Sequence, residues 1–408
     1  MNINRIIITE PQETELYFPL NLLRPVFDVK FGMFTFRSLT ELLSGRIIDD
    51  LLCDERFYGV LNESGNNLKI NRDVSGGGLV LVSNHYPEKQ LLDFIFSNTG
   101  KAIYKNGKLI AFHATDVISD VNKLYTSAEE MEKTEYPGEV QFFNSSWDAV
   151  KIFKQNFTTQ IGLKGVNETI AKPEGIHQIN PENISISQDS VVMPGSVLDA
   201  SAGKVIVEAS ALIEPYVYIK GPAYIGKNVT IKTGTKIYGP VYIGYFSKVS
   251  GEISSSIFHS LVNKQHDGFT GDSYFCPFVN LGADTVTSNL KNNYSYIRVK
   301  IREAEFNSGM QFLGSLIGDH SKTSINTMLN TGSIVGAFAN IFGAGFHPKF
   351  INSFTWNESG SLPELYDFEK AMITTKAAMS RRQTEMSDKY MELCKMLYDQ
   401  TSLAMKLN

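Results

Sequence analysis

The sequence is poor in cysteine and has no long apolar run. Its three cysteines, Cys53, Cys276 and Cys394, are far apart in a chain of 408 residues. An odd number at these spacings offers neither a disulfide framework nor a zinc site, which favours a reducing compartment. No apolar stretch reaches the ~18 residues of a membrane-spanning helix, and the apolar stretch near the N-terminus is too short for a signal peptide. We therefore expect a soluble protein of the cytoplasm.

Charge of one sign is not concentrated anywhere along the chain. The 38 basic residues are spread among 43 acidic ones, and the formal net charge is −5. A nucleic-acid-binding protein needs a clustered basic face, so neither nucleic acid nor a membrane surface is an expected partner. The length exceeds what one compact core accommodates, and it predicts two or three domains.

What the sequence does have is a repeat with a period of six residues. Neither an α-helix, at 3.6 residues per turn, nor a β-strand, at 2, has this period. A six-residue period is typical of a coil with three short flat faces, in which each repeat points one aliphatic side chain into a shared interior. The uninterrupted aliphatic positions are Val207, Ile213, Ile219, Ile225, Ile231, Ile237, Ile243 and Val249.

This pattern resembles the hexapeptide-repeat family of left-handed parallel β-helices, most of whose members are acyltransferases. The period breaks after Val249, and residues 250–268 are polar and rich in serine. We expect these residues to form one long insertion that projects from a single face, where solenoid proteins bind ligands. The repeat then returns at six apolar positions: Phe275, Leu281, Ile317, Leu329, Val335 and Ile341.

Residues 1–145 alternate strand and helix signals, which predicts an α/β layer domain. The expected elements are a strand at 4–9, a helix at 38–47 with Ser38 as N-cap, and a strand at 76–83. A hairpin at 102–112 should turn at Asn106-Gly107, which supplies the positive φ angles of a tight turn.

The remaining boundaries follow from the end of this domain and the extent of the repeat. Residues 146–183 should form a helical linker, with the helix at 146–160, and residues 184–345 the β-helix. Residues 346–408 should form a loop and a helix, because apolar residues there recur at spacings of three, four and seven. Such a tail packs on its own solenoid as a cap, or contacts another copy of the chain.

One stretch has specific chemical content. It runs from Asn263 to Asp272 and includes His266, and it is followed by the segment Asn280–Thr285 and by Asn289. This order and spacing resembles the acetyltransferase domain of bifunctional N-acetylglucosamine-1-phosphate uridyltransferase/glucosamine-1-phosphate N-acetyltransferases. The resemblance covers residues 184–345.

The resemblance implies a role for each matched residue. His266 would be the general base that takes the proton of the amine, since histidine titrates near physiological pH. Asn280 and Asn289 would bind the sugar, and a backbone N–H near Ala283 would stabilise the oxyanion of the acetyl-CoA thioester. The alternatives are a loop histidine without a catalytic task and asparagines that stabilise β-helix turns.

Two positions depart from the family pattern. The family's tyrosine three residues after the histidine is Phe269 here, and its lysine twelve residues before the histidine is Ser254. These departures leave a different amino-sugar phosphate open as the acceptor. Four lysines are candidates for the cation that binds the phosphate of the substrate: Lys232, Lys236, Lys248 and Lys264. We assign this role to Lys264, because it is nearest to His266.

The N-terminal domain lacks the Gly-x-Gly-Thr-Arg loop with which sugar-phosphate nucleotidyltransferases usually begin. Residues 18–32 resemble instead the N-terminal segment of a divergent sugar-nucleotidyltransferase family that occurs fused to the same β-helix. The resemblance implies that Arg24 and Lys30 contact phosphate oxygens, which a bidentate guanidinium suits. A structural ion pair is the other reading of Arg24. Asp28 would hold Mg²⁺ or pair with Arg24.

Together these features predict a bifunctional enzyme of amino-sugar nucleotide synthesis. The β-helix would acetylate glucosamine 1-phosphate from acetyl-CoA, and the N-terminal domain would join the product to UTP, with Mg²⁺ neutralising the triphosphate. The resemblance also implies a homotrimer. Two alternatives remain open: a nucleotidyltransferase whose acyltransferase domain has altered or lost its activity, and a non-enzymatic trimeric scaffold.

Overall fold

The computed structural model describes residues 5–63, 69–70, 77–114, 121–164 and 173–407. The chain divides into two compact units. The first contains the residues up to Ile152 together with Ser387–Met396, and the second contains Phe153–Met386 together with the residues from Leu397 onward. In the described part of the chain, no helix combines the length and the apolar character needed to cross a bilayer.

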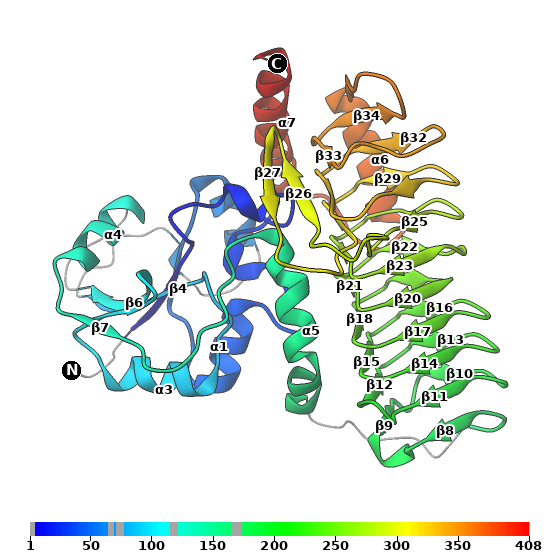
Figure 1. Cartoon of the computed structure of the whole chain (residues 1–408), viewed down its shortest axis with the longest axis horizontal. Helices are drawn as coiled ribbons and strands as arrows, with labels where there is room; N and C mark the ends of the chain where they lie inside the picture. Colours follow the sequence, from blue (N-terminus) through cyan, green and yellow to red (C-terminus); the bar gives the residue numbers. More distant parts are fainter. Residues whose placement is uncertain (1–4, 64–68, 71–76, 115–120, 165–172, 408) are drawn as a thin grey trace. The chain divides into compact units, whose positions relative to one another are not determined.

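A seven-stranded sheet forms the centre of the first unit (Figure 1). The strand β1 pairs in parallel with β2 and β4, and β6 runs antiparallel to β4 and β5. All four residues of β1 are buried, which explains its run of β-branched residues. In spatial order the strands are β3 (Lys69–Ile70), β2 (Asp50–Leu52), β1 (Ile6–Thr9), β4 (Gly78–Val82), β6 (Lys108–Ala114), β5 (Ala102–Lys105) and β7 (Lys133–Glu135).

The α/β class expected for this domain is confirmed, with one helix start displaced. The predicted N-cap, Ser38, is in fact the third residue of helix α1 (Phe36–Ser44). Thr35 caps the helix, because its hydroxyl accepts from Ser38 N–H while the Ser38 hydroxyl accepts from Thr35 N–H. The other helices of this region are α2 (Tyr58–Glu63), α3 (Lys89–Ser97), α4 (Val121–Glu129) and α5 (Ser146–Leu163).

The turn of the predicted hairpin also forms. Strands β5 and β6 pair antiparallel around Asn106 and Gly107, whose φ angles are 51° and 75°. Both residues thus adopt the left-handed region that a tight hairpin turn requires.

The second unit is a parallel β-helix with three faces, consistent with the predicted left-handed class (Figure 1). We call these the first, second and third faces. The first face contains β9 (Ile184–Ile186), β12 (Val205–Val207), β15 (Ala223–Ile225), β18 (Val241–Ile243), β21 (Ile257–Phe258), β24 (Tyr274–Phe275), β28 (Ser315–Ile317), β31 (Ser333–Val335) and β33 (Phe350–Ile351).

The second face contains β10 (Val191–Val192), β13 (Leu212–Ile213), β16 (Thr230–Ile231), β19 (Lys248–Val249) and β22 (Asn263–Lys264), and then β29 (Lys322–Thr323), β32 (Asn340–Phe342) and β34 (Thr355–Glu358), with β35 (Glu364–Leu365) at its edge. Bridges at Asn280 join the two parts of this face. The third face contains β8 (His177–Ile179), β11 (Val197–Asp199), β14 (Tyr218–Lys220), β17 (Lys236–Tyr238), β20 (Glu252–Ser254) and β23 (Phe269–Gly271), followed by β25 (Val286–Thr287) and β30 (Met328–Leu329).

The aliphatic positions of the six-residue repeat form the interior, as predicted. All eight, from Val207 to Val249, are at most 1% exposed, and they belong to one continuous apolar cluster. The six positions at which the repeat returns are equally buried. The parallel strands extend beyond residues 184–345 at both ends, from β8 to β34.

The prediction that residues 250–268 form an insertion is wrong. They build an ordinary coil through β20, β21 and β22, in which Ile253 pairs with Ile237 and Lys264 with Val249. The period breaks because this coil is shorter and because Lys264 occupies an interior position, where the pattern expects an aliphatic residue. The real insertion separates β25 from β28 and carries the antiparallel hairpin β26 (Arg298–Ile301) and β27 (Ala304–Asn307).

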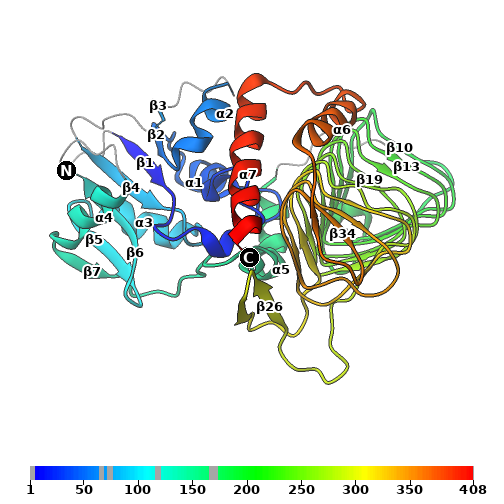
Figure 2. The same cartoon turned by 90° about the horizontal axis from the view of Figure 1, so that it is seen from above.

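Two helices follow the last coil. Helix α6 (Phe368–Ser380) begins at its N-cap Asp367, whose carboxylate accepts from Lys370 N–H. Its residue Ala378 lines a pocket with Lys248 of β19, Asn263 of β22 and Lys322 of β29, so α6 lies over this part of the second face (Figure 2). The second helix is α7 (Asp388–Leu407). The tail therefore contains two helices in place of the single helix predicted.

Candidate functional site

His266 lies at an exposed corner of the β-helix, between the second and third faces. The corner connects β22 to β23, and His266 stands two residues after the interior position Lys264. Ala283 stands two residues after the next interior position, Leu281, so the two residues occupy equivalent corner positions in successive coils. The structure thus brings His266 and Ala283 to one edge of the molecule.

A groove of 620 Å³ continues along this corner. It is lined by Asp284, which follows Ala283, and by residues of the next coils: Ser324, Ile325, Asn326, Met328, Gly343, Ala344 and Gly345. We call it the corner groove. The backbone is closely packed here, since Asn326 N–H donates to the carbonyl of Ala283 over 2.7 Å. Small residues at 343–345 leave space for an extended ligand.

The structure places Lys264 inside the coil, where its side chain is 1% exposed. Its ammonium donates to three backbone carbonyls, those of Ser250 at 3.1 Å, His266 at 2.9 Å and Asp267 at 3.3 Å. Burial lowers the pKa of this amine to about 8. Lys264 therefore supports the corner from within, and its ammonium is not at the surface where a substrate phosphate would bind.

Asn280 lies on the outward side of the second face, away from the corner. It forms bridges to Asn263 on one side and to Lys322 on the other. Its side-chain oxygen accepts from Asn263 Nδ2 over 2.7 Å. Asn280 lines a pocket on this face together with Asn263 and Lys322.

Asn289 does not lie on the second face but two residues after the end of β25, a strand of the third face. Its amide Nδ2 donates to Asp272 over 2.7 Å, and Asp272 also forms an ion pair with Lys154. Asp272 is 3% exposed, so this pair is part of the packed structure. Within one chain, the structure does not bring Asn289 together with Asn280.

The four lysines considered as phosphate ligands occupy different places. Lys232 forms an ion pair with Glu214, and Lys236 is exposed on the third face, in the same sheet as Ser254 and Phe269. Lys248 alone among them lines the pocket that contains Asn280.

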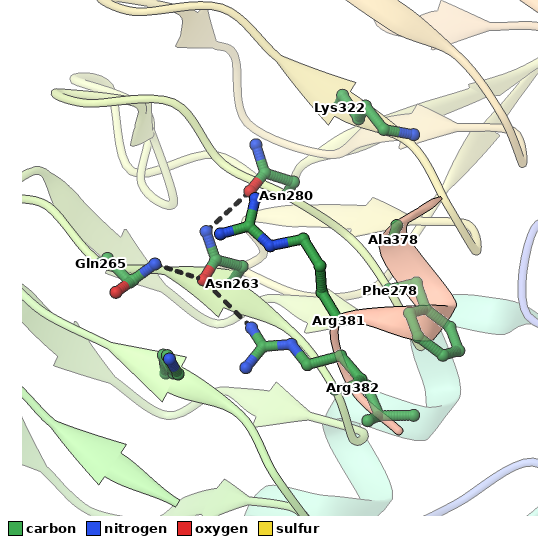
Figure 3. Close-up of a pocket in the computed structure, with 10 residues that line it drawn as sticks. Asn263, Gln265, Phe278, Asn280, Lys322, Ala378, Arg381 and Arg382 are labelled. Carbon is green, nitrogen blue, oxygen red and sulfur yellow. Dashed lines mark hydrogen bonds between the residues drawn. The ribbon is translucent and has the colours of Figure 1, made fainter. Parts of the chain in front are cut away.

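That pocket has a volume of 270 Å³ and is rich in positive charge (Figure 3). We call it the basic pocket. Its cations are Lys248 and Lys322 from the second face and Arg381 and Arg382, which directly follow α6. The remaining lining residues are Leu261, Asn263, Gln265, Phe278, Asn280 and Ala378.

Sequence reasoning missed Lys322, Arg381 and Arg382. Lys322 lies next to Asn280 on the second face, but the inserted hairpin separates the two residues in the sequence. Their proximity is therefore not visible in the sequence. The adjacent arginines after an amphipathic helix were the available signal, but the tail gave no indication of which face it covers.

In the first unit, Arg24 and Lys30 lie in the segment after β1, which follows the carboxyl edge of the parallel strands. Arg24 Nη1 donates to the carbonyl of Leu20 over 2.9 Å. The backbone of Lys30 forms an antiparallel β-bridge with that of Thr35. Asp28 forms an ion pair with Arg37, at 3.1 Å, and the charge of Arg24 also favours its ionised form. Burial raises the pKa of Asp28 above its usual value.

Two further polar residues lie at the carboxyl ends of β1 and β4. The Glu10 carboxylate accepts from the N–H groups of Val26 and Asp54, each over 2.9 Å, and thereby ties the segment that contains Arg24 to the sheet. His85 is fully buried beside the ring of Phe36, and burial lowers its pKa to about 3, so its ring is neutral. In open α/β sheets ligands bind at this edge, near the strand at which the order reverses.

The described residues do not offer a preformed metal site. No group of three His, Cys, Asp or Glu side chains in this part of the chain is arranged to hold an ion. The carboxylates nearest the expected nucleotide segment, Glu10 and Asp28, already have backbone and arginine partners. We place no Mg²⁺ on these side chains.

Residues 6–163 match the model of the protein family described as sugar nucleotidyl transferase. The chain is similar to that family over its N-terminal domain. The resemblance that the sequence suggested for the N-terminal segment is thereby confirmed, although this domain lacks the usual glycine-rich loop.

Three curated proteins are similar to longer or shorter parts of the chain. A bifunctional sugar-1-phosphate nucleotidylyltransferase/acetyltransferase of Sulfurisphaera tokodaii is 30% identical over 207 residues, or 48% of this chain and 50% of that protein. The bifunctional protein GlmU of Methanococcus aeolicus is 26% identical over 307 residues, or 71% and 68%. That of Methanococcus vannielii is 30% identical over 115 residues, or 28% and 27%.

All three relatives are named as bifunctional proteins. The name of the Sulfurisphaera protein gives the two activities, nucleotidylyltransferase and acetyltransferase. The chain is thus similar to bifunctional transferases of this kind, as the sequence predicted. The matched region spans half of the length of the Sulfurisphaera protein.

Proposed function

We propose that the β-helix transfers an acetyl group from acetyl-CoA to the amine of glucosamine 1-phosphate. The observation that supports this most directly is the position of His266, exposed at a corner from which the corner groove continues past Ala283. A groove of 620 Å³ has room for part of a coenzyme A thioester. The names of the relatives point to the same chemistry.

In this proposal the amine nitrogen attacks the thioester carbonyl carbon, and the carbon–sulfur bond breaks as the tetrahedral intermediate collapses. His266 takes the amine proton and delivers it to the leaving thiolate, so that the products are the amide and coenzyme A. The N–H near Ala283 would donate to the oxyanion of the intermediate. Proton transfer of this kind contributes roughly 10²–10⁴-fold to the rate.

The acceptor sugar would be shared between copies of the chain. Asn280 and Asn289 lie on different faces of one coil, where their side chains bond to Asn263 and Asp272, respectively. A homotrimer, in which neighbouring copies complete the site, accommodates all three residues. The molar mass in solution, measured by light scattering, tests this.

The acetyl transfer is tested by product identification. The protein is incubated with acetyl-CoA and glucosamine 1-phosphate, and the expected product is N-acetylglucosamine 1-phosphate, detected by its mass. A panel of other amino-sugar phosphates covers the departures at Phe269 and Ser254. Absence of an acetylated product with every acceptor would contradict the proposal and favour a β-helix without acyltransferase activity.

We further propose that the N-terminal domain joins N-acetylglucosamine 1-phosphate to UTP and releases pyrophosphate. Support comes from the family match of residues 6–163 and from the position of Arg24 near the carboxyl edge of the sheet. Arg24 and Lys30 would bind the triphosphate. Mg²⁺ would enter with UTP and neutralise its charge.

Pyrophosphate release tests the second reaction. We expect release from UTP with N-acetylglucosamine 1-phosphate in the presence of Mg²⁺, and much slower release from Arg24→Met and Lys30→Met. The matched control is Lys89→Met, which removes an exposed lysine paired with Asp93. Full activity of both variants would show that other cations bind the nucleotide. No release from any nucleotide would leave the scaffold alternative.

A further inference from the structure

The four cations of the basic pocket have no acidic neighbours within it. None of its ten lining residues is a carboxylate. Burial lowers the pKa of Lys248, and the nearby charges of Arg382, Arg381 and Lys232 lower it further. Burial and the charge of Arg381 likewise lower the pKa of Arg382. Like charges gathered at one site repel each other, and an arrangement of this kind is stabilised when an anion binds.

Helix α6 accounts for only a small part of this charge. The C-terminal end of a helix carries about half a negative charge, which attracts basic residues in its last turn. Arg381 caps α6, so one arginine there has a structural explanation. Four cations exceed what the helix end neutralises, and two of them, Lys248 and Lys322, belong to the β-helix itself.

The three amide side chains of the pocket, Asn263, Gln265 and Asn280, are linked by hydrogen bonds. Asn263 Oδ1 accepts from both Gln265 Nε2, at 2.8 Å, and Arg382 Nη2, at 3.1 Å, and Asn280 Oδ1 accepts from Asn263. These bonds occupy the amide oxygens and leave the Nδ2 group of Asn280 as a donor. Figure 3 shows the Arg381 side chain reaching toward Asn280.

The guanidinium of Arg382 is held in place before any ligand arrives. Besides its bond to Asn263, it lies over the ring of Phe246, 5.4 Å from the ring centroid. A preorganised arginine loses little side-chain entropy on binding, which favours phosphate recognition. The pocket thus combines fixed donors with an excess of positive charge.

We propose that the basic pocket binds the phosphoryl group or groups of a small phosphorylated ligand. A volume of 270 Å³ accommodates one or two phosphoryl groups, with the remainder of a larger ligand outside. Charge decides the class, because four cations without a carboxylate among the lining residues favour a ligand with several negative charges. The site is distinct from the corner groove, with which it shares no lining residue.

The pocket includes Asn280, which is proposed above to bind the acceptor sugar, but the inference is argued from the cations alone and does not require acetyl transfer. The phosphoryl group has more than one possible source, which the experiment separates. Inorganic pyrophosphate, UDP, glucosamine 1-phosphate and coenzyme A are titrated separately into the full-length protein by calorimetry. Pyrophosphate is the reference probe, since it has the charge and size of the site without other recognition groups.

The variants are Lys248→Gln and the double substitution Arg381→Gln/Arg382→Gln. We expect the affinity for pyrophosphate to fall at least tenfold in each, and further at high salt, because charge dominates binding. Lys300→Gln is the matched control, a lysine of the inserted hairpin that is paired with Glu303, and should bind as the wild type does. Circular dichroism and molar mass confirm that each variant keeps its fold and oligomeric state.

Three outcomes would overturn the proposal. One is that none of the four probes binds at millimolar concentration. Another is equal loss of affinity in Lys300→Gln, which would indicate nonspecific attraction. The third is dissociation of an oligomer by the arginine substitutions without loss of probe binding, which would show that the pocket holds an acidic segment of a second copy. Failure of acetyl transfer alone would not bear on this pocket.

Discussion

The ammonium of Lys264 donates a hydrogen bond of 2.9 Å to the carbonyl oxygen of His266. A buried cation within the apolar stack thus holds the backbone that carries the proposed base. Lys264 also donates to Ser250 and Asp267, so it joins this corner to the previous coil. It is a positioning residue in the proposed acetyl transfer.

Replacing Lys264 by Met keeps the length of the side chain and removes its donors. We expect kcat for acetyl transfer to fall about tenfold or more, since small misplacements of catalytic groups have effects of this size. The KM for acetyl-CoA should stay within about threefold, because the corner groove is unchanged. Steady-state kinetics separates the two constants, and a rise in KM with unchanged kcat would contradict the positioning role.

The stability difference between wild type and Lys264→Met should depend on pH. The pKa of Lys264 is about 8 in the folded protein, below the ordinary value for lysine of 10.5. Between these values the unfolded chain binds a proton that the folded chain does not, so stability rises with pH. We expect the wild type to gain stability relative to the variant between pH 8 and 10. Urea unfolding at several pH values measures this, and a constant difference would contradict it.

Binding of pyrophosphate to the basic pocket should weaken as the pH rises through about 8. Burial lowers the pKa of Lys322 to about 8, and burial with neighbouring cations lowers that of Lys248. Both lose charge on the alkaline side, whereas the two arginines of the pocket stay charged. Calorimetry at pH 7 and 9 tests this, with Lys322→Gln expected to reduce the dependence.

The interior ladder should account for much of the stability of the β-helix. Ile237 is fully buried in the third face, next to Ile219 and Ile253 in neighbouring coils. Ile237→Ala should lower the free energy of unfolding by about 2–5 kcal/mol. The adjacent Tyr238 is exposed, and Tyr238→Ala should have a much smaller effect. Equal effects in chemical denaturation would contradict the assignment of faces.

The aliphatic ladder could be predicted because its period is independent of the rest of the chain. The coil at 250–268 could not, because Lys264 occupies an interior position that a pattern of apolar residues does not recognise. The same error displaced the expected insertion, which is the hairpin β26–β27. Local helix signals located α1 to within three residues at each end, and the start was displaced because the capping box of Thr35 and Ser38 was misassigned to Ser38 alone.

Of the candidate site, the sequence predicted the neighbours in one corner but not the arrangement across faces. His266 and Ala283 are close because each follows an interior position by two residues. Asn280 and Asn289 have similar local sequences, yet β25 places Asn289 on another face. The arginines after α6 join Lys248 only through the packing of the tail, which local patterns do not specify.

The rate of thiol release from acetyl-CoA with glucosamine 1-phosphate tests the central claim most directly. We predict release by the wild type, at least a hundredfold slower release by His266→Ala, and wild-type release by His177→Ala, which removes an exposed histidine from the first coil. Turnover of His266→Ala equal to that of the wild type would contradict the assignment of His266 as the base.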